Sequence, residues 1–409
     1  MPQQRDFYAA ILFLDVSGFT RITEAASARG HYGVELVTKV LNRYFGRVHK
    51  LITPLGGEIV KFGGDACLIV IPIQPGACSE EHKPDIPALI AAILEEVSRL
   101  DRRFRKEYGF PFSIHGAWGK GIVSLSVVGD SSRHLDYYVS SPDLKAVYDL
   151  AETSQAGQIQ GPATHAQPPP ELPDLPAKGS RAARLFLPSD IIRKLELEPR
   201  PAELRNATVL FIKLSPTRSD DITLDQYQAA FHRIQSLITN HLGLINKIDF
   251  NEKGYLILAL FGVPFVYGND TLRAFSSAYR ISLLRLEGIS IQIGITYSNI
   301  YCGIIGAPAR HEYGIIGNAV NIAARLMSFA QPGEVCLSKE LIPHLEGQFE
   351  TTWLARASVK GIAEPLDIYR LLRMLPARWG SLEEQYRADP LFLDPLKLQT
   401  LQQGLASQG

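Results

Sequence analysis

The chain is poor in features that would each define a class of protein. Its 409 residues include four cysteines, which lie far apart and form no Cys-x-x-Cys pair: Cys67, Cys78, Cys302 and Cys336. This usage predicts buried free thiols in a reducing compartment rather than disulfides. The formal net charge is zero, from 42 basic and 42 acidic residues. No basic field therefore indicates a nucleic-acid partner, and no acidic excess indicates disorder.

Long hydrophobic runs are also missing. The longest apolar run extends from Leu256 to Val266 and is interrupted by Gly262 and Pro264. It is too short to span a bilayer, and the first six residues contain no apolar export signal. We therefore expect no membrane insertion and a cytoplasmic protein. The length of the chain favours two domains.

The most informative stretch is a strand that ends in a carboxylate. Ile11-Leu12-Phe13-Leu14 is a buried-strand pattern, Asp15 follows, and Ser17-Gly18-Phe19-Thr20 turns towards a helical pattern near Thr23. Further on, Gly63-Gly64 precedes Asp65 between two strands. Two carboxylates at neighbouring strand ends could share hard cations, and the turn N–H groups could face phosphate oxygens. The alternative is that both carboxylates only satisfy N–H groups of their turns.

Strand and helix patterns alternate over residues 7–160. The spacing of apolar residues predicts strands at 9–14, 112–118 and 122–128, the last two as a pair, a hairpin around 62–65, and helices at 34–51, 86–108 and 144–152. This is a β-α-β-β-α-β plan. It predicts an α+β fold whose helices cover one face of a mostly antiparallel sheet.

The plan is repeated in the second part of the chain. A Pro-rich excursion at 163–176 and a short helix at 187–197 separate the copies, and 208–215 mirrors 10–17. We expect a first domain at 1–188, a linker at 189–204, a second domain at 205–375 and a connector at 376–409. Two copies of one fold would pack about a pseudo-twofold axis.

The copies differ in a complementary way. The second copy aligns Lys213 and Gly254 with Asp15 and Asp65, so it cannot hold the same metals. It has instead Asn321 and Arg325, four residues apart and hence on one helix face, and the first copy has no such pair. A facing pair would therefore have one complete site and one degenerate site.

At this point the sequence resembles the class III nucleotidyl cyclases, and more narrowly the tandem catalytic half of the soluble, bicarbonate-responsive adenylyl cyclases and their bacterial relatives. The motifs that carry the resemblance are 13–20, Lys61-Phe62-Gly63-Gly64-Asp65, Ile245-Asn246-Lys247 and the long run 310–327. It implies two ferredoxin-like domains that form an intramolecular pseudo-twofold dimer, with further C-terminal regulatory domains beyond this chain. We expect a monomer.

The resemblance also implies an activity, the conversion of ATP to 3′,5′-cyclic AMP and pyrophosphate by two-metal catalysis at one site between the domains. Asp15, Asp65 and the Val16 carbonyl would bind two Mg²⁺ or Mn²⁺ ions. One ion would activate the ribose 3′-hydroxyl, and the other would hold the triphosphate. The remaining implied roles are phosphate binding by the backbone of Gly18, Phe19 and Thr20, transition-state stabilisation by Arg325, ribose orientation by Asn321, contact with adenine N1 by Lys247, and a degenerate-site counterpart, Lys61.

Two departures from the family pattern limit these expectations. Gly314 stands where adenylyl cyclases usually place an Asp or Thr that accepts from the adenine amine, so GTP is an alternative substrate. The helix pattern at 140–152 offers only Lys145 where an Arg would help to hold bicarbonate, so we do not predict bicarbonate binding. An alternative to the enzyme is a nucleotide-binding regulatory module with little or no turnover. Arg325, Asn321, Lys247 and Lys61 also have purely structural alternatives.

Overall fold

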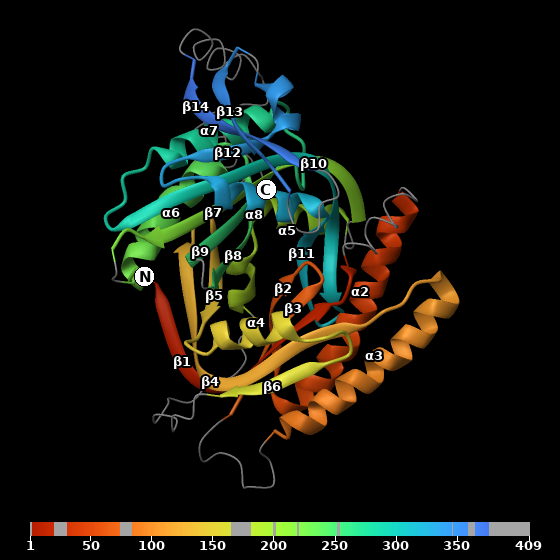
Figure 1. Cartoon of the computed structure of the whole chain (residues 1–409). Helices are drawn as coiled ribbons and strands as arrows, with labels where there is room; N and C mark the ends of the chain where they lie inside the picture. Colours follow the sequence, from red (N-terminus) through yellow and green to blue (C-terminus); the bar gives the residue numbers. More distant parts are fainter. Residues whose placement is uncertain are drawn as a thin grey trace, which may run out of the picture.

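A computed structural model describes residues 2–19, 31–73, 84–164, 181–198, 202–218, 221–251, 254–345, 347–358 and 365–375. The start of the helix expected near Thr23, most of the Pro-rich segment and the connector at 376–409 lie outside these residues. The described chain is a mixed α+β structure with two sheets, as predicted (Figure 1).

The first half forms one sheet with strand order β2-β3-β1-β4-β5, and β6 pairs with β4. Its elements are β1 (Gln3–Val16), α2 (His31–Ile52), β2 (Glu58–Gly63), β3 (Ala66–Pro72), α3 (Ile86–Tyr108), β4 (Ile114–Asp130), β5 (His134–Ser140), α4 (Leu144–Thr153) and β6 (Ile159–Thr164). The short helix α5 (Ser189–Leu197) follows.

The second half forms the other sheet, with strand order β13-β14-β12-β10-β7-β9-β8 and β11 paired with β10. Its elements are β7 (Ala202–Pro216), α6 (Leu224–Asn240), β8 (Leu244–Asn251), β9 (Gly254–Phe261), α7 (Asp270–Ser282), β10 (Ile289–Ala307), β11 (Arg310–Ile316), α8 (Asn318–Phe329), β12 (Val335–Ser338), β13 (Phe349–Ala357) and β14 (Leu366–Met374).

The helix predicted at 86–108 is α3, and local chemistry explains both of its ends. The Asp85 side chain accepts a hydrogen bond from the Ala88 N–H at 3.0 Å, which satisfies one of the free donors of the first turn. Gly109 ends the helix with φ 79°, a left-handed conformation that glycine adopts without steric cost. The predicted hairpin at 62–65 is the β2–β3 turn.

The prediction that 112–118 and 122–128 are two paired strands was wrong. One continuous strand, β4, runs through both segments, and both of its parts pair with the same strand β1. The second half likewise has one long strand, β10. Gly119 and Gly121 do not mark a turn. A Cβ atom on Gly121 would lie 1.8 Å from the Asp143 carboxylate, so glycine there allows the close approach of the segment before α4.

The prediction that helices cover one face of the sheet was also wrong. Leu12 and Leu14 of β1 pack with α2 and α3, whereas Ala9 and Ile11 pack with Leu144 at the start of α4. Successive strand residues point to opposite faces, so a strand that is apolar at every position is covered on both sides. The run Ala9-Ala10-Ile11-Leu12 is fully buried and already has this pattern.

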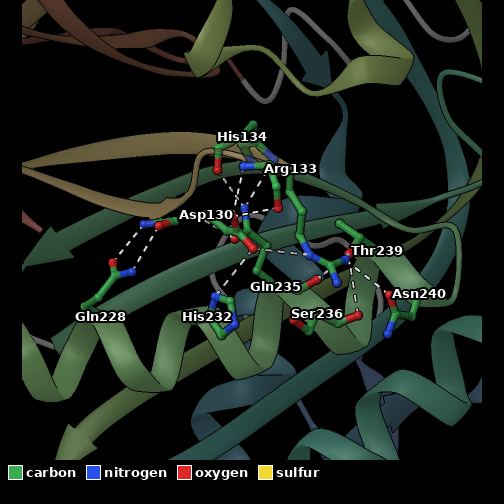
Figure 2. A network of polar contacts seen from close by, with 11 residues as sticks. Asp130, Arg133, His134, Gln228, His232, Gln235, Ser236, Thr239 and Asn240 are labelled. Atoms are coloured by element: carbon green, nitrogen blue, oxygen red, sulfur yellow. Dashed lines mark hydrogen bonds and ion pairs between the residues drawn. The ribbon is translucent and has the colours of Figure 1, made fainter. Parts of the chain in front are cut away.

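A hairpin of each half contacts a helix of the other half. Asn42 of α2 accepts from the Gly306 N–H at 2.8 Å and donates to the Ile304 carbonyl at 3.1 Å, at the β10–β11 hairpin. In the reciprocal contact, Gln228 of α6 accepts from the Gly129 N–H at 2.8 Å at the β4–β5 hairpin (Figure 2). The two halves are therefore joined by a pseudo-twofold pair of contacts within one chain.

Candidate functional site

Asp15 and Asp65 are brought together at adjacent strand ends. Asp15 lies near the end of β1, Asp65 lies in the β2–β3 turn, and their carboxylates are close enough to hydrogen-bond to each other. Burial raises the pKa of both groups, and the negative charge of Asp15 raises the pKa of Asp65 further, well above its usual range. Two carboxylates that repel each other in a partly dry site form an environment that favours a bound cation.

His115 is the neighbour of this pair that sequence reasoning missed. The residue lies opposite Asp15 in the β1–β4 register, and its Nε2 is 3.8 Å from Asp15 Oδ2. Its Nδ1 is 3.1 Å from Ser17 Oγ, and the Val16 N–H donates to Asp15 Oδ1 at 3.0 Å. Only the strand register, which the sequence pattern did not provide, places His115 here.

The donor set fits a hard cation that is shared with a substrate. Among the described residues no group of three or more His, Cys, Asp or Glu side chains could hold a metal ion. Magnesium is commonly held by one or two carboxylates together with substrate phosphates and water, so the pair Asp15 and Asp65 is sufficient for that mode. The adjacent turn contains Gly18 with φ 72°, and Phe19 packs against the core of the first half. Thr20 lies outside the described residues.

Lys247 reaches from the second half to the turn that carries Asp65. Its Nζ donates to the carbonyl of Phe62 at 2.7 Å, and Phe62 precedes Asp65 by three residues. Burial, reinforced by the nearby charge of Lys61, lowers the pKa of Lys247, while the Glu312 carboxylate opposes that shift. The structure thus places the lysine expected to contact the base close to the turn of the carboxylate expected to bind metal.

Gly314 lies on β11 opposite Gly303. A Cβ atom at position 314 would lie 2.6 Å from Ile305 Cδ1, so Ile305 fills the space that a side chain would need. Glu312, two residues earlier and hence on the same face of β11, is a partly buried carboxylate whose charge acts on Lys247. Arg310 holds it at 2.8 Å. Sequence reasoning did not single out Glu312.

Asn321 and Arg325 are both exposed on α8, one turn apart, as their spacing predicted. The helix buries its other side through Ala319 and Ala323 against the second sheet. The corresponding positions of α4 in the first half hold Lys145 and Asp149, which form an exposed ion pair at 2.8 Å. The asymmetry of the two helices, already visible in the sequence, is therefore retained in the structure.

The strand registers correct one alignment. Lys61 pairs with Leu68, three residues after Asp65, and Lys247 pairs with Leu258, three residues after Tyr255. The counterpart of Asp65 is therefore Tyr255 and not Gly254. The ring of Tyr255 stacks on Tyr227 at 4.0 Å and meets Tyr138, the counterpart of Gly314, edge-on at 5.3 Å.

The pseudo-symmetric position is thus filled by the chain itself. Besides the aromatic rings, Lys61 Nζ lies 3.8 Å from the Asp136 carboxylate and 4.3 Å from the centre of the Tyr137 ring. Burial raises the pKa of Asp136 to about 6, although Lys61 opposes the shift. The counterparts of Asp65, Gly314 and Lys247, which are Tyr255, Tyr138 and Lys61, are therefore all engaged with other side chains of the protein.

The chain belongs to the family described as the adenylate and guanylate cyclase catalytic domain, a class III cyclase fold. This family matches residues 1–165 and 225–373, one segment in each half. The two matches show the tandem repeat that the sequence predicted.

Among individual relatives, adenylate cyclase type 10 of Mus musculus is 25% identical over 439 aligned residues, which cover 91% of this chain and 27% of that protein. The Homo sapiens protein of the same name is 24% identical, and 92% of this chain and 27% of that protein are covered. This chain therefore spans about a quarter of the length of these relatives.

Among solved structures, the adenylyl cyclase CyaB from P. aeruginosa aligns with 43% of this chain and 98% of its own, at 21% identity and a TM-score of 0.38. The guanylyl cyclase Cya2 aligns with 43% of this chain and 95% of its own, at 23% identity and a TM-score of 0.38.

Two expectations drawn from what the sequence lacks can be compared with the structure. No helix among the described residues is long and apolar enough to cross a membrane. Cys67, Cys302 and Cys336 are free and buried, as predicted, and Cys78 lies outside the described residues.

Proposed function

We propose that this chain is an adenylyl cyclase that converts ATP to 3′,5′-cyclic AMP and pyrophosphate at one site between its halves. The proposal rests mainly on the hydrogen bond between Lys247 and the turn that carries Asp65. This bond brings a lysine of the second half, proposed to contact the base, close to a carboxylate of the first half, proposed to bind metal. The relatives named adenylate cyclase type 10 support it over most of this chain. The reaction is proposed for this chain alone, which covers 27% of that relative.

Asp15 and Asp65 would hold Mg²⁺ or Mn²⁺, with the Val16 carbonyl as a further oxygen ligand. Two such ions supply activation of the ribose 3′-hydroxyl and neutralisation of charge on the triphosphate. The N–H groups of Gly18, Phe19 and Thr20 bind phosphate oxygens, as a turn before a helix does in many phosphate sites. From β4, His115 is hydrogen-bonded to Ser17 and lies 3.8 Å from the Asp15 carboxylate, where it would help to position both.

The second half contributes the groups that read the nucleotide. Arg325 stabilises charge that develops on the α-phosphate, because a guanidinium offers several donors in one plane. Asn321 orients the ribose, and Lys247 donates to adenine N1. Both Asn321 and Arg325 are exposed and so are free to meet a substrate.

ATP is the proposed substrate, and GTP is the alternative. Gly314 offers no acceptor for the adenine amine, and a lysine donor suits guanine O6 as well as adenine N1. The charge of Glu312 acts on Lys247, and we infer that this carboxylate supplies the acceptor that Gly314 lacks. A nucleotide-binding module without turnover is the second candidate. It is motivated by Gly314 and by the helix of the first half, α4, which lacks counterparts of Asn321 and Arg325.

The Asp15→Asn variant tests the site. Loss of one metal carboxylate is expected to lower turnover by at least about 100-fold, because preorganised charge in such sites supplies effects of that size. Asp149→Asn, on the exposed ion pair with Lys145, is the matched control and is expected to retain activity. Turnover that survives Asp15→Asn would contradict the assignment.

The substrate is tested by product formation from ATP and from GTP, each with Mg²⁺ and with Mn²⁺. Cyclic AMP is the expected product. Cyclic GMP alone would retain the site and overturn the base assignment. Nucleotide binding without either product would favour the regulatory module.

A further inference from the structure

The strand β2, which leads to the turn of Asp65, lies at the edge of its sheet and has one irregularity. Among the described strands it pairs with β3 alone. The register shifts between Ile59 and Lys61, so Val60 is an extra residue, a β-bulge, in the middle of the strand. Only residues 61–64 separate this bulge from Asp65. An edge strand with a disrupted ladder needs further contacts to be held in one place.

Arg310 of the second half supplies such contacts. The residue begins β11, and its Nε donates to the Ile59 carbonyl at 3.0 Å. Its Nη2 donates to the Tyr137 hydroxyl at 2.9 Å, and that hydroxyl donates to the Val60 carbonyl at 2.7 Å. One guanidinium therefore holds two successive carbonyls of β2, the first directly and the second through Tyr137 of β5.

The same guanidinium lies against the aromatic side chain that precedes the turn. Its central carbon is 5.4 Å from the centre of the Phe62 ring. Gly306 of the β10–β11 hairpin also meets this ring, because a Cβ atom on Gly306 would lie 3.0 Å from Phe62 Cζ. Glu312 accepts from Nη2 at 2.8 Å, and the Arg310 side chain is only 19% exposed. Packing and a planar fork of donors thus fix Arg310 at the boundary between the halves.

The pseudo-symmetric strand β8 has the same bulge but holds it in a different way. The β8–β9 register shifts between Ile245 and Lys247, so the extra residue is Asn246. Its own side chain makes the contact, because Asn246 Nδ2 donates to the Tyr313 carbonyl of β11 at 2.8 Å. The corresponding residue of β2 is a valine, which has no polar side-chain atom. The bulge of β2 therefore depends on side chains from other strands.

The position of Arg310 also differs between the halves. Arg310 is the first residue of β11, and the equivalent first residue of β5 is His134. The Nδ1 and the carbonyl of His134 both lie within hydrogen-bond distance of Gln235 Nε2 on α6, at 3.3 and 2.9 Å. Arginine therefore occupies this position in the hairpin that reaches the strand leading to Asp65.

We propose that Arg310 is a positioning residue that fixes the bulge of β2, and through it the turn of Asp65, relative to the second half. This inference rests on the proposed function. In the structure described, Lys247 also holds β2, because its Nζ donates to the Phe62 carbonyl. When ATP is bound, Lys247 turns to the base. Arg310, with Tyr137, is then the hydrogen-bonded link that keeps β2 against β11 while the nucleotide reacts.

Two variants test the inference by steady-state kinetics. Arg310→Met removes every donor of the link but also deprives Glu312 of a partner. Tyr137→Phe removes one hydroxyl and no charge, keeps the ring beside Lys61, and covers the case in which Arg310→Met does not fold. Each should lower kcat about tenfold or more, since small misplacements of reacting groups cost rate. The KM for ATP should change less than about threefold, because the groups that bind the nucleotide are retained.

The two matched controls remove the same side-chain groups elsewhere. Arg373→Met breaks an exposed ion pair with Glu350 at 2.6 Å, and Tyr267→Phe removes a hydroxyl that donates to Asp190 at 3.1 Å. Both should keep the kcat and the KM of the wild type. The double variant Arg310→Met with Tyr137→Phe should lose little more than Arg310→Met alone, because both changes break one link. Losses that multiply would overturn the inference.

Hydrogen exchange of the segment 58–65 separates positioning from a general loss of stability. It is measured in the full chain with and without 3′-deoxy-ATP and Mn²⁺, an analogue that lacks the reacting hydroxyl. With the analogue bound, exchange in Arg310→Met and Tyr137→Phe should exceed that of the wild type about tenfold, the effect of a lost hydrogen bond. Without it the excess should be smaller, because Lys247 still holds the strand. Equal exchange in wild type and variants, or a uniform increase over all segments, would contradict the inference.

The two hypotheses fail in different ways. If the wild type is active and both variants keep its kcat and its exchange of 58–65, only the role of Arg310 fails. If the wild type forms no cyclic nucleotide but the variants exchange 58–65 faster, the proposed function fails and the hold of Arg310 on β2 stands.

Discussion

Lys247 has two partners in the proposed cycle, the Phe62 carbonyl in the structure described and the base when ATP is bound. We expect Lys247→Met to raise the KM for ATP about tenfold or more, because hydrogen bonds from charged groups contribute roughly 1.5–3 kcal/mol. The maximal rate should fall less than the affinity. Steady-state kinetics with the exposed Lys145→Met as control measure both values. An unchanged KM with normal turnover would make Lys247 a purely structural contact between the halves.

The candidate site residues that could be singled out from the sequence are those marked by a local pattern, such as a strand end, a turn or a helical spacing. Asp15 follows an apolar strand, Asp65 follows a Gly-Gly turn, and the spacing of Asn321 and Arg325 fixes one helix face. His115 could not be found in this way, because its place depends on a strand register. The alignment of Asp65 with Gly254 failed for the same reason.

The β4–β5 hairpin is the element of the first half that docks on α6. Gln235 Nε2 donates to the His134 carbonyl at 2.9 Å, and its Oε1 accepts from the Asp130 N–H at 3.2 Å (Figure 2). Arg133 adds a hydrogen bond to the Thr239 hydroxyl. His134 is buried in this contact, and its Nε2 has no partner among the described residues. A neutral His134 imidazole therefore suits this buried contact between the hairpin and α6.

This contact should make stability depend on pH. Burial and then the charge of Arg133 lower the pKa of His134 to about 4, whereas an exposed histidine titrates near about 6.5. Between these values the unfolded chain binds the proton and the folded chain does not, so stability falls as the pH falls through this window. The contribution is at most about 1.4 kcal/mol per pH unit. Denaturant unfolding of wild type and His134→Gln between pH 6.5 and 4 measures the difference.

The comparison with the variant is needed because Asp136 acts in the opposite direction. Its pKa is raised to about 6, so the folded chain holds a proton that the unfolded chain releases, and stability falls as the pH rises towards 6. The wild-type slope is therefore a sum of opposed effects, and His134→Gln should remove only one of them. His232→Gln, whose imidazole is half exposed, is the control. Equal pH slopes for wild type and His134→Gln would contradict the prediction.

Secondary structure was predicted best where a cap or a turn lies next to a regular pattern. The helix α3 has a capping Asp85 and a terminal Gly109, and both of its ends were found. The break expected in β4 was wrong because Gly119 and Gly121 do not turn the chain. They leave room for neighbouring segments that pack closely against the strand. The close approach of Asp143 to Gly121 is a long-range contact, and a local pattern does not contain it.

The two halves share their cores across the whole molecule. Tyr301, Ile305 and Ile316 of the second half pack with Phe45 and Phe62 of the first. Val128 and Tyr138 of the first half pack in the core built on α6. Separation of the halves would expose both sets of apolar side chains to water. Each half is therefore expected to depend on the other for its folded state.

A site formed inside one chain can be distinguished from a site formed between chains by mixing two inactive variants. Asp15→Asn removes a group of the first half, and Arg325→Ala removes a group of the second, each with an expected loss of at least about 100-fold in turnover. If the halves of one chain build the site, co-expression of the two variants should restore no activity, because every chain still lacks one group. If chains exchange halves, intact pairs form and turnover returns. The shared cores favour the first outcome, since an exchange would have to open both apolar contacts at once.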